Sequence, residues 1–192
     1  MDEMGLLNEL TSAVGVSGFE DKIRSLLARH VESFGFETWT DRLGSLIARK
    51  EGSGPRVMVV AHMDEIGFVV RYVDDKGYLY LTKVGGVNPR TLPGARVVVW
   101  AGGDPLTGVV GEKPIHRMKE EELKKAPELD KLFVDLGLPP EQVKERVRLG
   151  DPVSFKPNFT ALGEGLVASK SLDDRLGCLV LLMVAEQVKD CL

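Results

Sequence analysis

Cysteine is scarce in this chain of 192 residues. Its two cysteines, Cys178 and Cys191, have no Cys-x-x-Cys spacing and no histidine nearby. Disulfide frameworks and cysteine zinc sites need several cysteines, or cysteines with histidines, at characteristic spacings. We therefore expect two buried or incidental thiols rather than a disulfide or a cysteine zinc site.

A surplus of positive charge is also missing. The chain has 25 Lys and Arg against 29 Asp and Glu, a net charge of −4, so the charge balance favours neither nucleic acid nor an anionic membrane as a partner. The first ten residues are acidic, whereas a secretory signal is basic and then apolar. We expect a cytoplasmic protein with no membrane partner.

The composition that is present, 43% hydrophobic and 28% charged residues, is ordinary for a soluble globular protein. The first third predicts an α/β unit with two helices. The first has Leu7 and Leu10 at helical spacing. The second is amphipathic, begins at a capping-box pair formed by Ser17 and Glu20, and ends at Gly35.

Three strands are predicted after these helices, over residues 36–40, 45–49 and 57–61. The last strand is uniformly apolar, so we expect it to be buried at the centre of a sheet. From about residue 68 the pattern becomes β-rich. Hairpins over 68–82 and 96–111, with many glycines and further short strands, predict a small barrel or sandwich.

Polar residues follow the apolar run: His62, Asp64 and Glu65. Open α/β sheets carry their chemistry beyond the carboxyl ends of the strands. Residues two apart in an extended segment point the same way, so His62 and Asp64 converge while Glu65 faces elsewhere. Taken alone, the segment is better explained as a strand followed by an exposed polar turn, because single histidines are common and easily satisfied.

A second acidic pair, Asp173 and Asp174, heads an apolar helix over residues 179–188. Carboxylates at a helix N-terminus have a simple explanation, because the helix dipole favours anions there. The alternative is a ligand shared by two cations, since two divalent ions about 3.5–4 Å apart need a bridging carboxylate. Together with His62, the metal interpretation becomes the favoured one.

The combination of motifs resembles the tetrahedral, TET-type aminopeptidases, the glutamyl-aminopeptidase family of di-metal exopeptidases, some of which carry old endoglucanase labels. The resemblance covers essentially the whole chain. The motifs that carry it are Gly15 to Glu20, Asp41 to Ser45, Ala61 to Gly67, Gly108 to His116, Leu132 to Gly137 and Ser171 to Gly177.

The resemblance implies that His62 is a terminal ligand of one metal and that Asp173 bridges two ions, Zn or Co, with a cis peptide after it. Asp64 is implied as the catalytic-site residue that orients the His62 imidazole. Asp174 would support the turn, and Arg175 the network around it. His116 lies within the β-rich part, where we expect a structural or assembly role.

The resemblance also implies an α/β fold: a mixed-sheet, zinc-peptidase-like domain, incomplete here, with an inserted β-rich, barrel-like assembly domain. We expect the peptidase domain over residues 1–69 and 162–192 and the insert over 70–161. Peptides would be the substrates, and the complete protein would form a homo-oligomer of the dodecamer type.

Complete members of the family continue beyond the position of Asp173. They supply a Glu-Glu pair that contains the general base, a further acidic ligand and a late histidine. We therefore expect an N-terminal portion that is inactive alone, with an apolar helix that lacks part of its cover. One alternative is a non-catalytic assembly or regulatory subunit. A glycoside hydrolase built on Asp64 or Glu65 with Asp173 would leave His62 without a purpose.

Overall fold

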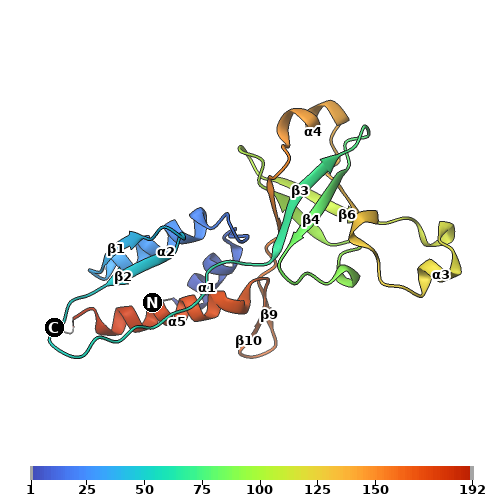
Figure 1. Cartoon of the computed structure of the whole chain (residues 1–192). Coiled ribbons are helices and arrows are strands. Elements are labelled where there is room, and N and C mark those ends of the chain that lie inside the picture. The colour runs from blue at the N-terminus through green and yellow to red at the C-terminus, as the bar shows by residue number, and fades with distance from the viewer. Residues whose placement is uncertain (1, 191–192) are drawn as a thin grey trace. The chain divides into compact units, whose positions relative to one another are not determined.

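The computed structural model describes residues 2–190 and divides into two compact units (Figure 1). The first unit combines the chain up to Glu65 with the residues from Pro157 onward, and the second runs from Ile66 to Lys156. These divisions lie a few residues from the boundaries that the sequence predicts. Strand β3 (Gly67–Val73) already belongs to the second unit, and strand β9 (Thr160–Leu162) pairs within the first.

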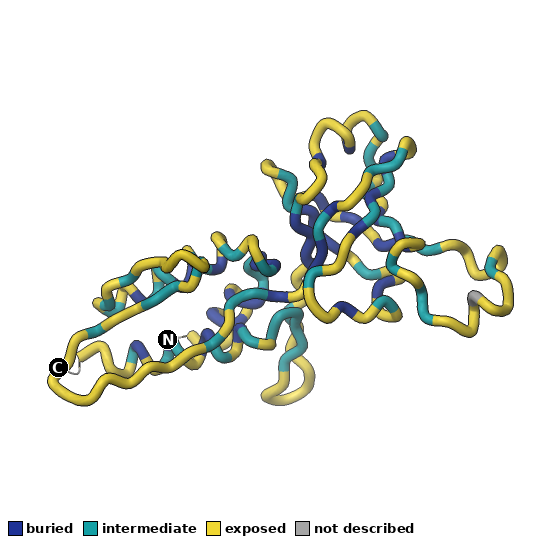
Figure 2. The backbone as a smooth tube through the Cα atoms, viewed as in Figure 1, coloured by how far each residue is buried: buried dark blue, intermediate teal, exposed yellow. Residues whose placement is uncertain are grey.

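Three helices build the core of the first unit: α1 (Glu3–Ser12), α2 (Asp21–Ser33) and α5 (Leu172–Val188). Asp2 caps α1 by accepting a hydrogen bond from the Gly5 backbone N–H at 3.0 Å. The buried residues of these helices, dark blue in Figure 2, belong to one apolar cluster. That cluster contains Leu6, Leu7, Leu10, Ile23, Leu26, Leu27, Val31, Cys178, Leu179, Leu182 and Ala185.

The strands of the first unit form two antiparallel hairpins. β1 (Glu37–Thr40) pairs with β2 (Leu46–Arg49), as predicted, and β9 pairs with β10 (Leu166–Ala168). Among the described residues, the first unit has no larger mixed sheet. One further bridge among the described residues of this unit is parallel, between Val16 and Glu65.

The prediction of a buried strand over residues 57–61 is wrong. Residues 57–60 form no strand, and their side chains are 58–86% exposed. An apolar run becomes a strand only where neighbouring strands satisfy its backbone N–H and C=O groups. No described strand pairs with this segment, which runs alongside α5 as an extended stretch (Figure 1).

The predicted capping box is also wrong. Glu20 precedes α2 without a side-chain cap, and its Oε1 accepts from the Gly18 N–H at 2.7 Å. The Ser17 hydroxyl instead donates to Asp64 Oδ2. A local pattern predicts a local bond, but a carboxylate brought near by the fold is the stronger acceptor.

The second unit is a closed six-stranded antiparallel barrel in the order β3-β4-β7-β6-β5-β8. Alternate side chains point inward, as β6 shows by its alternation of buried and exposed residues. The predicted hairpins are therefore confirmed, and they close into a barrel rather than a sandwich. The remaining strands are β4 (Leu79–Val84), β5 (Arg96–Val99), β6 (Leu106–Gly111), β7 (Phe133–Asp135) and β8 (Pro152–Phe155).

Short helical segments connect these strands. Helix α4 (Pro140–Arg146) buries Val143 in the barrel core, and α3 (Glu120–Leu123) lies in a run of charged residues over 119–125. Single 3₁₀ turns occur at η1 (Pro89–Thr91), η2 (Ile115–Arg117) and η3 (Leu129–Lys131). Across residues 2–190, no helix is both long and apolar enough to span a membrane.

Candidate metal centre

Three of the predicted site residues meet in the first unit, although they are far apart in the sequence. His62 Nε2 lies 2.9 Å from Asp173 Oδ1, and His62 Nδ1 lies 3.1 Å from Asp64 Oδ1. All three side chains are accessible: His62 is 55% exposed, Asp64 39% and Asp173 94%. The imidazole is thus held between two carboxylates at the surface of the unit.

Hydrogen bonds and neighbouring charges shift the pKa values of His62 and Asp64 in opposite directions. Partial burial lowers the pKa of His62, but its hydrogen bond to Asp173 and the charge of Asp64 outweigh this effect and raise the pKa above its usual value. The Ser17 hydroxyl is the largest cause that lowers the pKa of Asp64; burial opposes it and His62 adds to it. Asp64 is therefore an ionised partner that orients the His62 ring.

The backbone at the start of α5 turns the two aspartates in different directions. Asp173 and Asp174 have non-helical φ and ψ angles, and the peptide between them is cis, as the resemblance implied. Asp174 Oδ1 accepts from the Gly177 N–H at 3.0 Å. Asp174 thus caps the helix, whereas Asp173 remains free to face His62.

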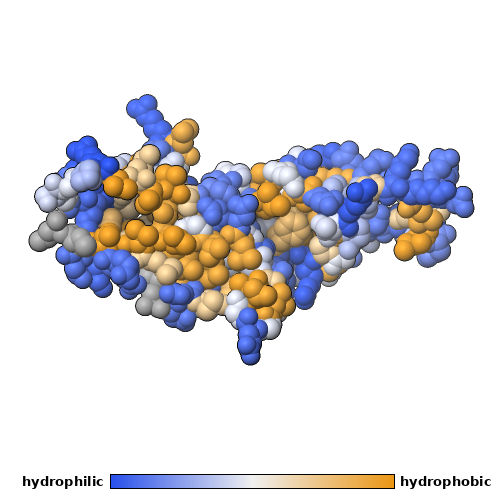
Figure 3. All heavy atoms as spheres, turned by 90° about the horizontal axis from the view of Figure 1, so that it is seen from below, coloured by the Kyte–Doolittle hydropathy of each residue, from blue (hydrophilic) through white to orange (hydrophobic). Residues whose placement is uncertain are grey.

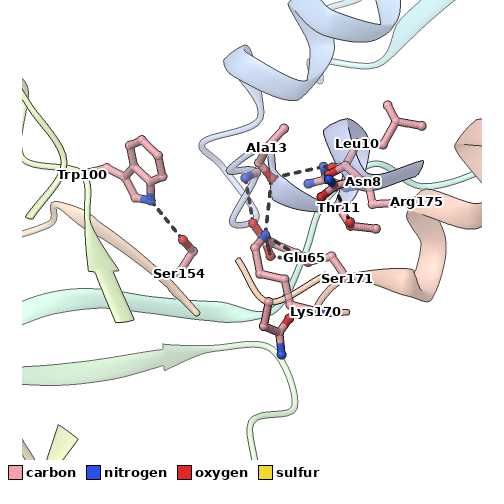
Figure 4. Close-up of polar contacts among 12 residues, drawn as sticks. Asn8, Leu10, Thr11, Ala13, Glu65, Trp100, Ser154, Lys170, Ser171 and Arg175 are labelled. Atoms are coloured by element: carbon pink, nitrogen blue, oxygen red, sulfur yellow. Dashed lines mark hydrogen bonds and ion pairs between the residues drawn. The ribbon is translucent and has the colours of Figure 1, made fainter. Parts of the chain in front are cut away.

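Behind the exposed trio lies a buried ion pair that the sequence did not reveal (Figure 4). Lys170 Nζ lies 2.7 Å from Glu65 Oε2, and the two side chains are 6% and 2% exposed. Ser171 also donates to Glu65 Oε2, and the Gly15 N–H donates to Oε1 at 3.0 Å. Burial lowers the pKa of Lys170, while Glu65 opposes the shift.

The alternation that predicts convergence of His62 and Asp64 also predicts that Glu65 faces elsewhere, and the structure turns it inward. The sequence does not predict its partner, because Lys170 lies 105 positions away and has no spacing relation to Glu65. The sequence offers one indication that Glu65 and Lys170 could meet, because each lies beside a predicted site motif. Lys170 comes three residues before Asp173, and Glu65 directly follows Asp64.

Arg175 is fully buried beneath the same region. Its Nη1 donates to the carbonyl oxygens of Leu10 at 2.5 Å and Ala13 at 3.3 Å. Gly15 makes room for it, because a Cβ at that position would lie 2.6 Å from Arg175 Nη2. Arg175 thus ties the head of α5 to the end of α1.

Cys178 is buried on α5, as expected, and its Sγ donates to the His62 carbonyl at 3.4 Å. Burial raises the pKa of this thiol to about 11, so it stays neutral at physiological pH. Cys191 lies outside the described residues. His116 lies in η2 of the other unit.

The donor types at the trio fit a divalent metal ion, but their number is incomplete. Imidazole nitrogen and carboxylate oxygen are common zinc ligands, and a carboxylate on the second ring nitrogen is usual for metal-bound histidine. Within residues 2–190, however, no three His, Cys, Asp or Glu side chains are grouped so that they could hold an ion. The trio therefore offers suitable donor types, but the described residues do not complete a metal site.

An open, mainly apolar groove runs beside Asp173. It lies between the extended segment, at Val59 and Val60, and the outer face of α5. Leu176, Val180 and Val184 on that face are 43–49% exposed. In the view of Figure 3, apolar side chains accordingly form a band on the first unit. The prediction that this apolar helix is incompletely buried is confirmed within the described residues.

Comparisons with known proteins extend these observations. The family model for the M42 glutamyl aminopeptidase matches residues 44–191. The lysyl aminopeptidase of Pyrococcus furiosus is 35% identical over 192 residues, which cover 98% of this chain and 56% of that protein. An aminopeptidase structure from Desulfurococcus kamchatkensis superposes with a TM-score of 0.89 at 37% identity, covering 96% of this chain and 52% of that one.

The TET1 peptidase of Pyrococcus horikoshii is also similar, with a TM-score of 0.88 and 33% identity. That match covers 98% of this chain and 57% of the TET1 chain. The chain thus spans about half the length of the relatives that it matches. Because the family model covers more than half of this chain, the chain belongs to the M42 glutamyl aminopeptidase family.

Proposed function

We propose that the chain is part of a metal-dependent, cytoplasmic aminopeptidase that removes N-terminal residues from peptides. The observation that carries this proposal is the His62–Asp173 pair, which joins two family motifs 111 residues apart through a 2.9 Å contact. A zinc-peptidase-like domain would be formed when further polypeptide adds strands beside residues 57–60. The exposed backbone and apolar side chains of that segment support this view.

In this proposal His62 and Asp173 are metal ligands, Asp173 being the one shared between two ions. Two divalent ions, zinc or cobalt, would supply Lewis acidity and a nucleophilic water at neutral pH. Asp64 accepts a hydrogen bond from the Nδ1–H of His62, which fixes the tautomer that leaves Nε2 free for a metal. The described residues contain no assigned general base, so we place the base on polypeptide that completes the site.

The barrel unit would serve subunit assembly. The TET1 peptidase of Pyrococcus horikoshii is described as assembling into a tetrahedron or a large octahedral shell, and we propose a comparable homo-oligomer here. The alternative is a non-catalytic assembly subunit, which the presence of only two donors at the trio supports. Size measurement after mixing with an intact relative would separate the two, because only the alternative predicts stable mixed oligomers.

The proposed function is tested with a chimera in which this chain replaces the matching part of the Pyrococcus furiosus lysyl aminopeptidase. We expect bound metal and hydrolysis of an aminoacyl-anilide. His62→Ala should lower both, by about 10²-fold or more for hydrolysis, because a ligand is lost. His116→Ala, the same change in the barrel unit, should alter neither. Equal metal content and activity in the two variants would refute the assignment of His62.

A further inference from the structure

The two segments that carry the trio are joined directly behind it by the buried ion pair. Glu65 follows Asp64 in the first segment, and Lys170 and Ser171 precede Asp173 in the second. Their side chains meet at Glu65 Oε2, where Lys170 Nζ lies at 2.7 Å and the Ser171 hydroxyl donates. Two contacts therefore join the same two segments: the exposed one between His62 and Asp173, and the buried one at Glu65.

The buried contact is well satisfied and anchored to the rest of the unit. Glu65 Oε1 accepts from the Gly15 N–H at 3.0 Å, and the Glu65 N–H donates to the Gly15 carbonyl at 2.8 Å. Lys170 Nζ also reaches the Ala13 carbonyl at 3.4 Å. A third segment, after α1, thus holds both partners, as the dashed lines in Figure 4 show.

The outer contact has no comparable support. Asp173 is 94% exposed and His62 55%, and solvent weakens interactions between exposed charged groups. The buried pair is shielded from solvent, so it is the stiffer constraint on the separation of the two segments. Ser171, directly before Leu172, has a left-handed φ of 58°, which is uncommon for serine, and its bond to Glu65 helps to hold that conformation.

We propose that Glu65, Lys170 and Ser171 form a positioning clamp that sets the separation between His62 and Asp173. These residues touch neither substrate nor metal in this proposal, and they act through the residues beside them. The separation is a property of the folded chain alone. Its importance for catalysis rests on the proposed function, because a metal site tolerates little displacement of its ligands.

The clamp is tested by chemical proximity, without metal or activity. His62→Cys and Asp173→Cys are introduced with Cys178→Ala and Cys191→Ala, so that two thiols remain. Dibromobimane fluoresces once it has alkylated both thiols, and the rate of the second alkylation reports how closely and how often they approach. Lys170→Met should slow this step by about tenfold or more. Lys170→Arg, which keeps the charge, should restore much of the rate.

Loss of stability alone must be distinguished from loss of positioning. Leu26→Ala removes a buried side chain from the α2 face of the same unit and serves as the matched destabilised control. Measured where both variants are folded, the second alkylation should keep its rate in Leu26→Ala. If Lys170→Met does not fold, Ser171→Ala, which keeps the ion pair, should still slow the step, by about threefold. Rates equal to the parent in every folded clamp variant would overturn the proposal.

Discussion

Replacing Lys170 by Met should destabilise the first unit strongly. The substitution removes the cation 2.7 Å from Glu65 Oε2 and leaves a carboxylate whose side chain is 2% exposed. Among the described residues, only the Ser171 hydroxyl and the Gly15 N–H then remain as donors to the Glu65 carboxylate. Removing one partner of a buried ion pair costs about 3–5 kcal/mol, because the other charge stays desolvated and unpaired.

A double substitution separates the charge effect from the effect of shape. Lys170→Met with Glu65→Gln removes both charges at similar side-chain volume, and replacement of a buried pair in this way is close to neutral in other proteins. We therefore expect the double variant to be more stable than Lys170→Met alone. The coupling free energy should be about 2–3 kcal/mol.

Urea unfolding followed by the fluorescence of Trp39 measures these changes. The chain has two tryptophans, and Trp39 lies on β1 of the first unit, so a Trp100→Phe background leaves one reporter there. Lys144→Met is the matched control, since it breaks an exposed lysine–aspartate pair in the barrel and should leave the Trp39 transition unchanged. A Lys170→Met transition at the control midpoint would refute the electrostatic reasoning.

Two further predictions concern packing and pH. Gly108→Ala should destabilise the barrel by about 1–3 kcal/mol, because its Cβ would lie 2.5 Å from Val134 Cγ1, whereas Gly103→Ala meets nothing within 4 Å and should not; thermal unfolding compares the two. The pKa of Cys178 rises on folding from 9.0 to about 11, so the unfolded chain binds fewer protons in that range and stability should fall between those pH values. Cys178→Ala should flatten this part of the stability curve in urea titrations at each pH, and an unchanged slope would contradict the assignment.

Local patterns in the sequence predicted most of the secondary structure. The helical spacing of Leu7 and Leu10, the glycine at position 35 and the paired β-runs of the barrel depend on neighbours a few residues away, and the structure has each of them. The opposite directions of Asp64 and Glu65 follow from the alternation of an extended chain in the same way. These features need no knowledge of distant segments.

Two predictions failed because a distant part of the chain decided the outcome. Ser17 matched a capping box, yet it donates to Asp64, 47 positions away. Residues 57–60 had the composition of a buried strand, yet no described strand satisfies their backbone. Composition measures how well a segment suits a sheet but says nothing about whether a neighbouring strand is present.

The sequence by itself determined the family and the residues that stand at the candidate centre, because the motifs around His62 and Asp173 are contiguous and specific. The tertiary structure alone decided what lies behind them. Glu65 and Lys170 are 105 positions apart, and only the packing of α1, α5 and the segment before the barrel encloses both. A buried charge is strongly destabilising without an oppositely charged partner. The pairing of Glu65 with Lys170 depends on the folded chain and cannot be read from residue spacing.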